Sequence, residues 1–258
     1  MSDADPTPRS RATALGVAVL IVLVAGLFAV GVVVNHVAGK DSAAGIATPV
    51  PSPTALPTPT PTPTPSPTPA PATIPYADCS KATFGPPLAP LNPPSDLHKY
   101  SAPPAASIDP TKLYQATITT SRGKIVLCLQ PQLAPNTVNN FVVLARNHFY
   151  DGLTFHRVEA QFVIQGGDPT GTGNGGPGYT FPDEPVHNVY VDGAVAMANS
   201  GPNTNGSQFF VCIGSQDNNQ CKSLQPQYNL FGKVESGLDV AQKVQKGDVM
   251  SISVSEEK

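Results

Sequence analysis

The chain has 258 residues, of which only 13% are charged, and its formal net charge at pH 7 is -3. This balance provides no basic surface of the kind that neutralises phosphates, which argues against nucleic acid as a partner. The composition has two outliers, 30 prolines and no tryptophan. Twelve of the prolines fall between Pro49 and Pro75, so the bias belongs to one segment rather than to the whole chain.

The first predicted element is a transmembrane helix over residues 12–34, which follows a cytoplasmic N-terminus over residues 1–11. The run holds 23 consecutive uncharged positions and would be about 35 Å long as a helix, enough to cross a bilayer. Arg9 and Arg11 precede it, which favours an N-terminus inside the cell and the rest of the chain outside. The alternative is a cleaved signal peptide, whose apolar region usually has about 7–15 residues. We therefore predict a single-pass anchor in the cell membrane, with release of the remaining chain if the segment is cleaved.

The next predicted segment is an extended linker over residues 35–75. Pro alternates with Ser and Thr through much of it, as in TPTPTPTPSPTP, and this pattern excludes helix and sheet and favours polyproline II. At about 3.1 Å per residue, such a spacer would hold a folded domain roughly 80–100 Å from the membrane. Residues 76–111 are again Pro-rich but include Leu88, Leu91 and Tyr100, so we predict an irregular extension that packs on the domain after it.

Residues 112–258 consist of short apolar runs broken by Gly, Asn and Asp, which is typical of an antiparallel β domain. A hairpin is predicted at residues 113–130, with its turn at residues 121–123. Apolar residues recur at helical spacing over residues 135–147 and 238–245, which predicts two helices. Further strands are expected at residues 153–158, 162–167, 194–199, 208–214, 229–234 and 251–255. This arrangement indicates a mainly β domain, built as a closed barrel that helices cap at its ends.

The four cysteines, Cys79, Cys128, Cys212 and Cys221, lack the CxxC spacing of zinc sites, so no metal is expected. The predicted location outside the cell permits disulfides. Cys212 with Cys221 would close a short loop, which would leave Cys79 with Cys128 to join the extension to the domain. Four cysteines allow three connectivities, however, and buried free thiols are the other interpretation.

Three motifs carry a specific resemblance. They are FHRVEAQFVIQGGDPTGTG (residues 155–173), MANSGPNTNGSQFFV (residues 197–211) and NLFGKV (residues 229–234). At these positions, and in this order, the chain resembles the cyclophilin type of peptidyl-prolyl cis-trans isomerase over residues 112–258. The resemblance implies an eight-stranded antiparallel β-barrel with two capping helices, and an isomerase activity that uses neither cofactor nor metal.

The resemblance also implies a set of site residues. The catalytic group would be Arg157, with Gln165 and Phe162 beside it. The residues expected to bind substrate along the groove are Val163, Gly173, Ala198, Asn199, Ser200, Gln208, Phe210, Leu224 and Tyr228.

These residue types suit the chemistry of prolyl isomerisation. Rotation about an X-Pro bond is slow because amide resonance creates a barrier of about 18–20 kcal/mol. In the twisted amide the prolyl nitrogen regains its lone pair, so the guanidinium of Arg157 could donate a hydrogen bond that the planar amide cannot accept. We expect an isomerase that acts on Pro-containing segments of exported proteins, as a monomer. The alternative is a proline-binding module that acts as a holdase or scaffold with incidental turnover.

Several residues depart from the family pattern or suggest other readings. Ser223 stands where the family usually has tryptophan and Tyr228 where it has histidine, so we expect weak cyclosporin binding. His156 is expected to be a packed histidine, because isomerisation transfers no proton. GTGNGG (residues 171–176) fits a dinucleotide motif, but the prolines that follow argue against the required helix. The glycosylation sequon at Asn205 lies within the groove motif, so we interpret it as coincidence.

Overall fold

The computed structural model describes residues 71–215 and 220–258. The predicted cytoplasmic N-terminus, the transmembrane helix over residues 12–34 and nearly all of the predicted linker lie outside these residues. In the part of the chain that is described, no helix has the length and apolar character needed to span a membrane. The described residues comprise the domain and its N-terminal extension.

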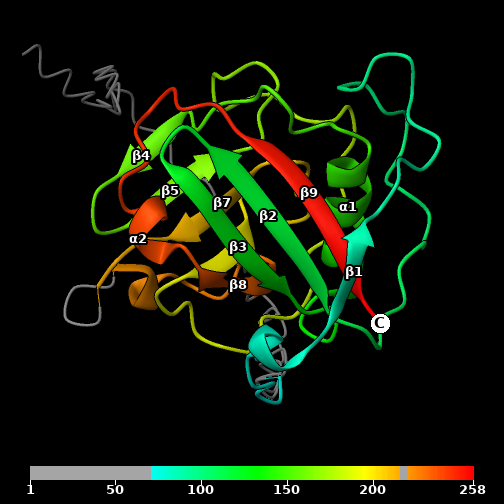
Figure 1. Cartoon of the computed structure of the whole chain (residues 1–258). Helices are drawn as coiled ribbons and strands as arrows, with labels where there is room; N and C mark the ends of the chain where they lie inside the picture. Colours follow the sequence, from blue (N-terminus) through cyan, green and yellow to red (C-terminus); the bar gives the residue numbers. More distant parts are fainter. Residues whose placement is uncertain (1–70, 216–219) are drawn as a thin grey trace, which may run out of the picture. The chain divides into compact units, whose positions relative to one another are not determined.

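One antiparallel sheet dominates the described residues (Figure 1). Its strands are β1 (Phe84–Pro87), β2 (Tyr114–Thr120), β3 (Gly123–Leu129), β4 (Arg157–Glu159), β5 (Val163–Gly166), β6 (Ala194–Met197), β7 (Phe209–Cys212), β8 (Leu230–Ser236) and β9 (Ser251–Glu257). Neighbouring strands follow the order β1-β9-β2-β3-β8-β6-β7-β5-β4. The helical elements are α1 (Pro135–Arg146), α2 (Leu238–Ala241) and two 3₁₀ turns, η1 (Cys79–Lys81) and η2 (Gln220–Ser223).

The prediction of a closed eight-stranded barrel is wrong in both respects for the described residues, because the sheet has nine strands and its order ends at β1 and β4. The additional strand, β1, comes from the extension and pairs with β9. At the other end, Phe155 and His156 are both buried, so the chain before β4 lacks the alternation of a strand. Thr154 makes an isolated bridge to Val249, beside which Met250 donates its N–H to the Leu153 carbonyl at 2.8 Å. The segments before β4 and β9 thus lie side by side there, but β4 and β9 are not neighbours in the strand order.

The predicted hairpin is confirmed as β2 and β3. Thr120 pairs with Gly123 across a two-residue turn. Tyr114, Ala116 and Ile118 are fully buried, whereas the residues between them are only partly covered. This period of two places one face of the hairpin in the core.

Helix α1 confirms the predicted helix within one residue of its end. Pro135 occupies the first turn, where its missing N–H is not needed. The carboxylate of Glu184 accepts hydrogen bonds from the backbone N–H groups of Asn136 and Thr137, at 2.9 and 2.8 Å, and so supplies the cap that Ala134 lacks.

The second predicted helix, over residues 238–245, is shorter than expected. Ala241 and Gln242 bond back to the fourth preceding residue, whereas Lys243 and Val244 bond to the third. The chain therefore tightens into turns after Ala241, and α2 ends there.

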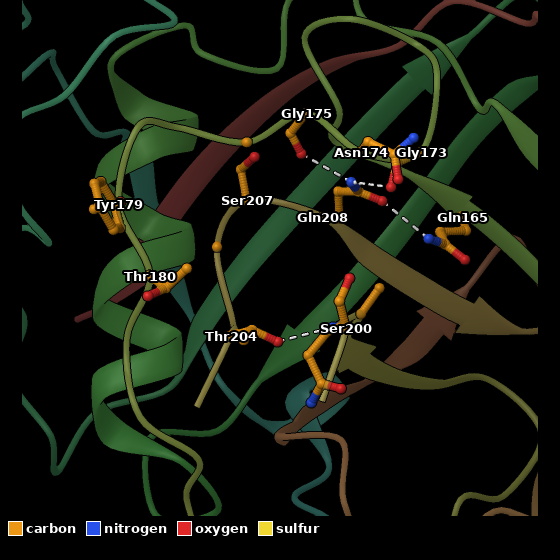
Figure 2. A pocket seen from close by; sticks show the side chains of 14 residues that line it. Gln165, Gly173, Asn174, Gly175, Tyr179, Thr180, Ser200, Thr204, Ser207 and Gln208 are labelled. Atoms are coloured by element: carbon orange, nitrogen blue, oxygen red, sulfur yellow. Dashed lines mark hydrogen bonds between the residues drawn. The ribbon is translucent and has the colours of Figure 1, made fainter. Parts of the chain in front are cut away.

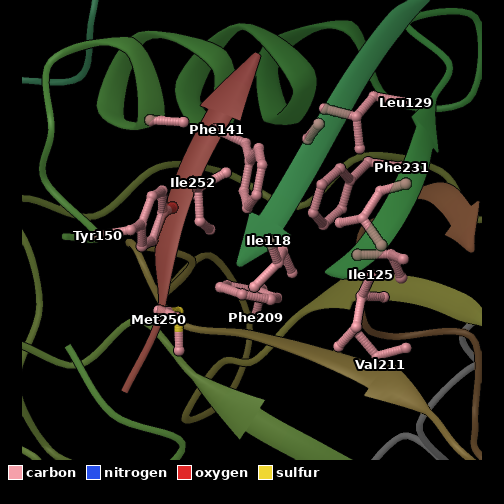
Figure 3. Close-up of a cluster of buried hydrophobic side chains, with 14 of the residues drawn as sticks. Ile118, Ile125, Leu129, Phe141, Tyr150, Phe209, Val211, Phe231, Met250 and Ile252 are labelled. Atoms are coloured by element: carbon pink, nitrogen blue, oxygen red, sulfur yellow. The ribbon is translucent and has the colours of Figure 1, made fainter. Parts of the chain in front are cut away.

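The apolar residues form two clusters on opposite faces of the sheet. The larger cluster lies between the sheet and α1, where Phe141 contacts the rings of Phe209 and Phe231, each with a centroid distance of 5.3 Å (Figure 3). The smaller cluster contains Val163 and Phe210. Because consecutive strand residues point to opposite faces, Phe209 belongs to the first cluster and Phe210 to the second. The face that carries Phe210 is the one on which the site is built.

The extension packs on the domain, and disulfides secure both it and the site. Cys79 is bonded to Cys128, and Cys212 to Cys221, which confirms the preferred pairing. Further along the extension, Leu88 donates its N–H to the carbonyl of Val254 at 2.7 Å. The extension does not line the apolar pocket described next.

Candidate active site

A pocket of about 340 Å³ opens on the outer face of β4, β5, β6 and β7. Its lining consists only of site residues that the family resemblance implies: Arg157, Phe162, Val163, Gln165, Ala198, Asn199, Phe210, Leu224 and Tyr228. They come from the strands β4, β5 and β7, from the positions just before β5 and just after β6, and from the segment between η2 and β8, so the fold joins residues that lie up to 71 positions apart (228 minus 157). The structure thus places these nine residues around one pocket.

The floor of this pocket is apolar and closely packed. Phe210 is only 4% exposed, and the ring of Tyr228 meets it edge to face with a centroid distance of 5.5 Å. Behind them, Tyr190 donates its hydroxyl to the backbone carbonyl of Tyr228 at 2.8 Å. A floor fixed in this way offers a preformed site for a small apolar ring.

Arg157 lies at the edge of the pocket and is held by two neighbours. Its Nε and Nη2 contact Oε1 of Glu159 at 2.9 and 2.7 Å, and its Nη1 donates to Oε1 of Gln165 at 3.1 Å. The centre of the guanidinium also lies 5.5 Å from the ring centroid of Phe162. Because a guanidinium carries five N–H donors, these contacts leave donors on Nη1 and Nη2 for a substrate.

Gln165 continues into a chain of amide hydrogen bonds (Figure 2). Its Nε2 donates to Oε1 of Gln208 at 3.0 Å. Nε2 of Gln208 in turn donates to the carbonyl oxygens of Gly173 and Gly175, at 2.9 and 2.8 Å. Since each amide must present its oxygen to one neighbour and its nitrogen to the next, the two loop carbonyls fix the direction of the whole chain up to Arg157.

A second pocket of about 320 Å³ adjoins the first and shares Gln165, Ala198 and Asn199 with it. It brings together the remaining predicted substrate residues, Gly173, Ser200 and Gln208. The predicted groove therefore consists of two adjoining pockets, one with an apolar floor and one lined largely by glycines and polar side chains.

The glycine-rich loop at residues 171–176 forms one wall of this second pocket and is followed by no helix, as predicted. Asp168, only 1% exposed, accepts hydrogen bonds from the N–H groups of Thr170 and Gly173 and from the Thr170 hydroxyl. Burial alone would raise the pKa of the Asp168 carboxyl, but these hydrogen bonds outweigh it and lower the pKa below its usual value. The carboxylate is thus charged at neutral pH and fastens the loop.

His156 packs beside this loop, as predicted. It is 9% exposed, and neither ring nitrogen has a hydrogen-bond partner among the described residues. Burial lowers the pKa of its imidazole below the ordinary 6.5, although the charge of Asp168 acts in the opposite direction. The ring is therefore neutral at pH 7 and contributes packing rather than proton transfer.

Two other interpretations from the sequence have different outcomes. Asn205 is fully buried and donates its side-chain N–H to Asp183 at 2.7 Å, so it has no room for a glycan. Ser223 is exposed and its hydroxyl donates to the carbonyl of Gln220 at 2.7 Å. Weak cyclosporin binding stays a prediction.

Glu159, Asp168 and Tyr190 are site-supporting residues that the sequence reasoning missed. Glu159 lies two positions after Arg157 on one strand, and this spacing, which places both side chains on one face, could have revealed it. Asp168 stands before Pro, Thr and Gly, a turn signal that could have indicated its role. Tyr190 lies 38 positions from its partner Tyr228, and nothing local announces their contact.

Within the described residues, no group of three or more His, Cys, Asp or Glu is arranged to hold a metal ion.

Comparison with known proteins agrees with the geometry of the site. The family model described as cyclophilin type peptidyl-prolyl cis-trans isomerase matches residues 115–257, more than half of the chain.

Curated relatives match the same region. A peptidyl-prolyl cis-trans isomerase of Helicobacter pylori is 42% identical over 158 residues, which cover 55% of this chain and 94% of that protein. Peptidyl-prolyl cis-trans isomerase B of Bacillus subtilis is 50% identical over 130 residues, 50% of this chain and 87% of the relative. A third, from Synechococcus elongatus, is 44% identical over 143 residues, 54% of this chain and 95% of the relative. The chain therefore belongs to the cyclophilin family and is a peptidyl-prolyl cis-trans isomerase.

Proposed function

We propose that this isomerase acts on X-Pro bonds of exported proteins and that Arg157 stabilises the twisted amide. The observation that carries the proposal is the position of the guanidinium. It is held by Glu159 and Gln165 at the edge of an apolar pocket, with N–H donors to spare. A donor fixed in advance beside the place where a prolyl ring would bind needs no reorganisation when the amide twists.

The selectivity of this donor for the transition state follows from the electronic structure of the amide. In the planar ground state the nitrogen lone pair is delocalised into the carbonyl and accepts no hydrogen bond. As the bond twists, the lone pair localises on nitrogen and the Arg157 N–H groups can bind it. Because the interaction exists only in the twisted state, it lowers the barrier instead of merely tightening substrate binding.

The apolar pocket fixes one side of the bond while the other side turns. Phe162, Phe210 and Leu224 would enclose the pyrrolidine ring, and the close packing of Phe210 with Tyr228 supports a rigid seat. Asn199 commits its side chain to the carbonyl of Gln227 at 2.9 Å and to the N–H of Gly201 at 3.4 Å. Its backbone thus lies on a braced rim where a substrate chain would bind.

Exported substrates and a membrane tether are the second part of the proposal. Both disulfides support an oxidising compartment, because such bonds persist outside the cytosol. The apolar run over residues 12–34 and the Pro/Thr-rich linker support an anchor that holds the domain away from the membrane.

The catalytic part is tested by comparing Arg157→Ala with Arg122→Ala in the full chain. Arg122 is a matched control, because its guanidinium is ion-paired with Asp248 and its side chain is 36% exposed, close to the 42% of Arg157. We expect Arg157→Ala to lower kcat/KM on an Ala-Pro peptide about 100-fold, the size typical of losing one transition-state donor. Arg122→Ala should match the wild type, and equal rates for all three chains would refute the role of Arg157.

A further inference from the structure

The N-terminal extension precedes the family match at residues 115–257, yet one of its residues contacts the wall of the substrate groove. Tyr100 donates its backbone N–H to the carbonyl of Pro177 at 2.8 Å. At the adjacent residue, Gly178 adopts φ +99° and approaches so closely that an added Cβ would lie 2.5 Å from the Tyr100 carbonyl oxygen. The extension and the segment after the glycine-rich loop therefore fit together with no room for a side chain between them.

The Tyr100 side chain secures this contact on both sides. Its ring meets Tyr179 edge to face, with a centroid distance of 6.4 Å, and lies 6.2 Å from the centroid of Phe149 in the core. Nδ2 of Asn147, at the end of α1, donates to the Tyr100 hydroxyl at 3.3 Å. Tyr100 thus connects the core and α1 to the segment that carries Tyr179, a residue of the second pocket.

The glycine-rich loop, just before this segment, orients the chain of amide hydrogen bonds. The carbonyls of Gly173 and Gly175 accept both N–H groups of the Gln208 amide. Gln208 then orients Gln165, whose Oε1 holds Nη1 of Arg157. Only the short segment from Gly175 to Pro177 separates these carbonyls from the backbone contact with Tyr100.

We propose that Tyr100 is a positioning residue for the isomerase reaction, which holds the loop at residues 173–179 in the place that aligns Gln208, Gln165 and Arg157. The extension is then a working part of this isomerase and not only a connection to the linker. The inference rests on the proposed role of Arg157. It predicts that loosening Tyr100 shifts the carbonyls of Gly173 and Gly175. Because these carbonyls orient the amide chain, the guanidinium of Arg157 should then be misaligned.

The test compares Tyr100→Ala, Tyr100→Phe and Leu88→Ala in the full chain. Leu88 is the matched control, because it is another partly buried apolar residue of the extension that packs on the same core, at the β1 end. Tyr100→Ala should lower kcat/KM about tenfold, mainly through kcat, as expected for a displaced catalytic group. Tyr100→Phe keeps the ring and should restore most of the rate, and Leu88→Ala should lower the melting temperature without lowering kcat.

A second readout separates positioning from general destabilisation. The side-chain NH₂ signals of Gln165 and Gln208 in NMR spectra should shift in Tyr100→Ala and stay in place in Leu88→Ala. If Tyr100→Ala does not fold, Tyr100→Leu keeps apolar bulk against Phe149, loses the edge contact with Tyr179, and should show the same lower kcat.

The outcomes distinguish this inference from the proposed function. A folded Tyr100→Ala or Tyr100→Leu chain with wild-type kcat, or an equal loss in Leu88→Ala, would overturn the role of Tyr100. An Arg157→Ala chain as active as the wild type would instead overturn the proposed function on which the inference depends.

Discussion

At the residue scale, the role proposed for Arg157 depends on the hydrogen bonds that its neighbours accept from the guanidinium. Glu159 and Gln165 hold the guanidinium from two sides, and the donors that remain are the ones a substrate can use. An arginine on a strand is ordinarily a solvated surface residue, and Arg157 is indeed partly exposed. The role proposed for Arg157 therefore depends on orientation rather than on burial.

We predict that Glu159→Gln lowers kcat/KM about threefold, because a neutral acceptor holds a guanidinium less firmly than a carboxylate. The melting temperature should not change, since both side chains of the pair are substantially exposed and exposed ion pairs add little stability. Asp239→Asn, which breaks an exposed ion pair between Asp239 on α2 and Lys243 just after it, is the control and should change neither quantity. An unchanged kcat/KM in Glu159→Gln would show that Gln165 alone suffices to orient Arg157.

His156 gives a prediction about pH. Its folded pKa lies below the ordinary 6.5, so between these two pKa values the unfolded chain binds more protons than the folded one. The contribution of the neutral ring to stability is therefore complete above about pH 7 and is lost as the pH falls from 6.5 through the folded pKa. Urea unfolding at several pH values between about 5 and 7.5 should show this decline in the wild type and a smaller one in His156→Gln.

The control for this prediction is His148→Gln, which alters a histidine whose side chain is 56% exposed. It should keep the decline of the wild type. If His156→Gln and His148→Gln give the same pH dependence, burial of His156 is not its cause.

At the scale of elements, the disulfide between Cys212 and Cys221 joins the end of β7 to η2. Leu224 follows η2 and donates its N–H to the carbonyl of Cys221 at 3.0 Å, so the position of this pocket residue depends on the bond. The double variant Cys212→Ser/Cys221→Ser should raise KM about threefold and leave kcat unchanged, because it loosens binding but does not touch Arg157.

The other disulfide provides the matched control. Cys79→Ser/Cys128→Ser releases the start of the extension, 49 residues from its partner, and should lower the melting temperature without raising KM. A rise of KM in both double variants, or in neither, would contradict the role assigned to the bond beside η2.

The elements that the sequence predicts well are those with local signals. Helix α1 follows from Pro135 and from the helical spacing of Val138, Phe141 and Val142, and the β2–β3 hairpin follows from alternation around Gly123. The site residues are predictable because dense motifs carry them. The open strand order, which ends at β1 and β4, is not predictable in this way, because pairing between distant strands leaves no local signal in the sequence.

Contacts between residues far apart in the sequence also limit how much of the site can be predicted. The contact of Tyr100 with Pro177 has no local signal in the sequence, because it joins residues 77 positions apart (177 minus 100). The amide direction of Gln208 is likewise decided by two carbonyls more than 30 positions earlier in the chain. Only three-dimensional proximity reveals such partners.

At the scale of the whole molecule, the proposed tether predicts how a protease reaches the chain. Protease added outside intact cells should cut in the linker over residues 35–75 and release an active domain, whereas a tag placed before residue 12 should stay protected. A linker in the expected polyproline II conformation would expose its peptide bonds, because that conformation leaves the backbone solvated. A tag cleaved from outside, or a domain reached only after lysis, would contradict the proposed orientation.

The central claim is that Arg157 stabilises the twisted amide and not merely the bound peptide. The most direct test measures, by exchange NMR with saturating Ala-Pro peptide, the cis–trans interconversion on the wild-type enzyme and on Arg157→Lys, together with the Kd. Lysine keeps the charge but lacks the planar fork that Glu159 and Gln165 hold. We predict a Kd within about threefold of the wild type and an interconversion rate about 100-fold lower. An unchanged rate, or a rate that falls only as far as binding weakens, would contradict the account.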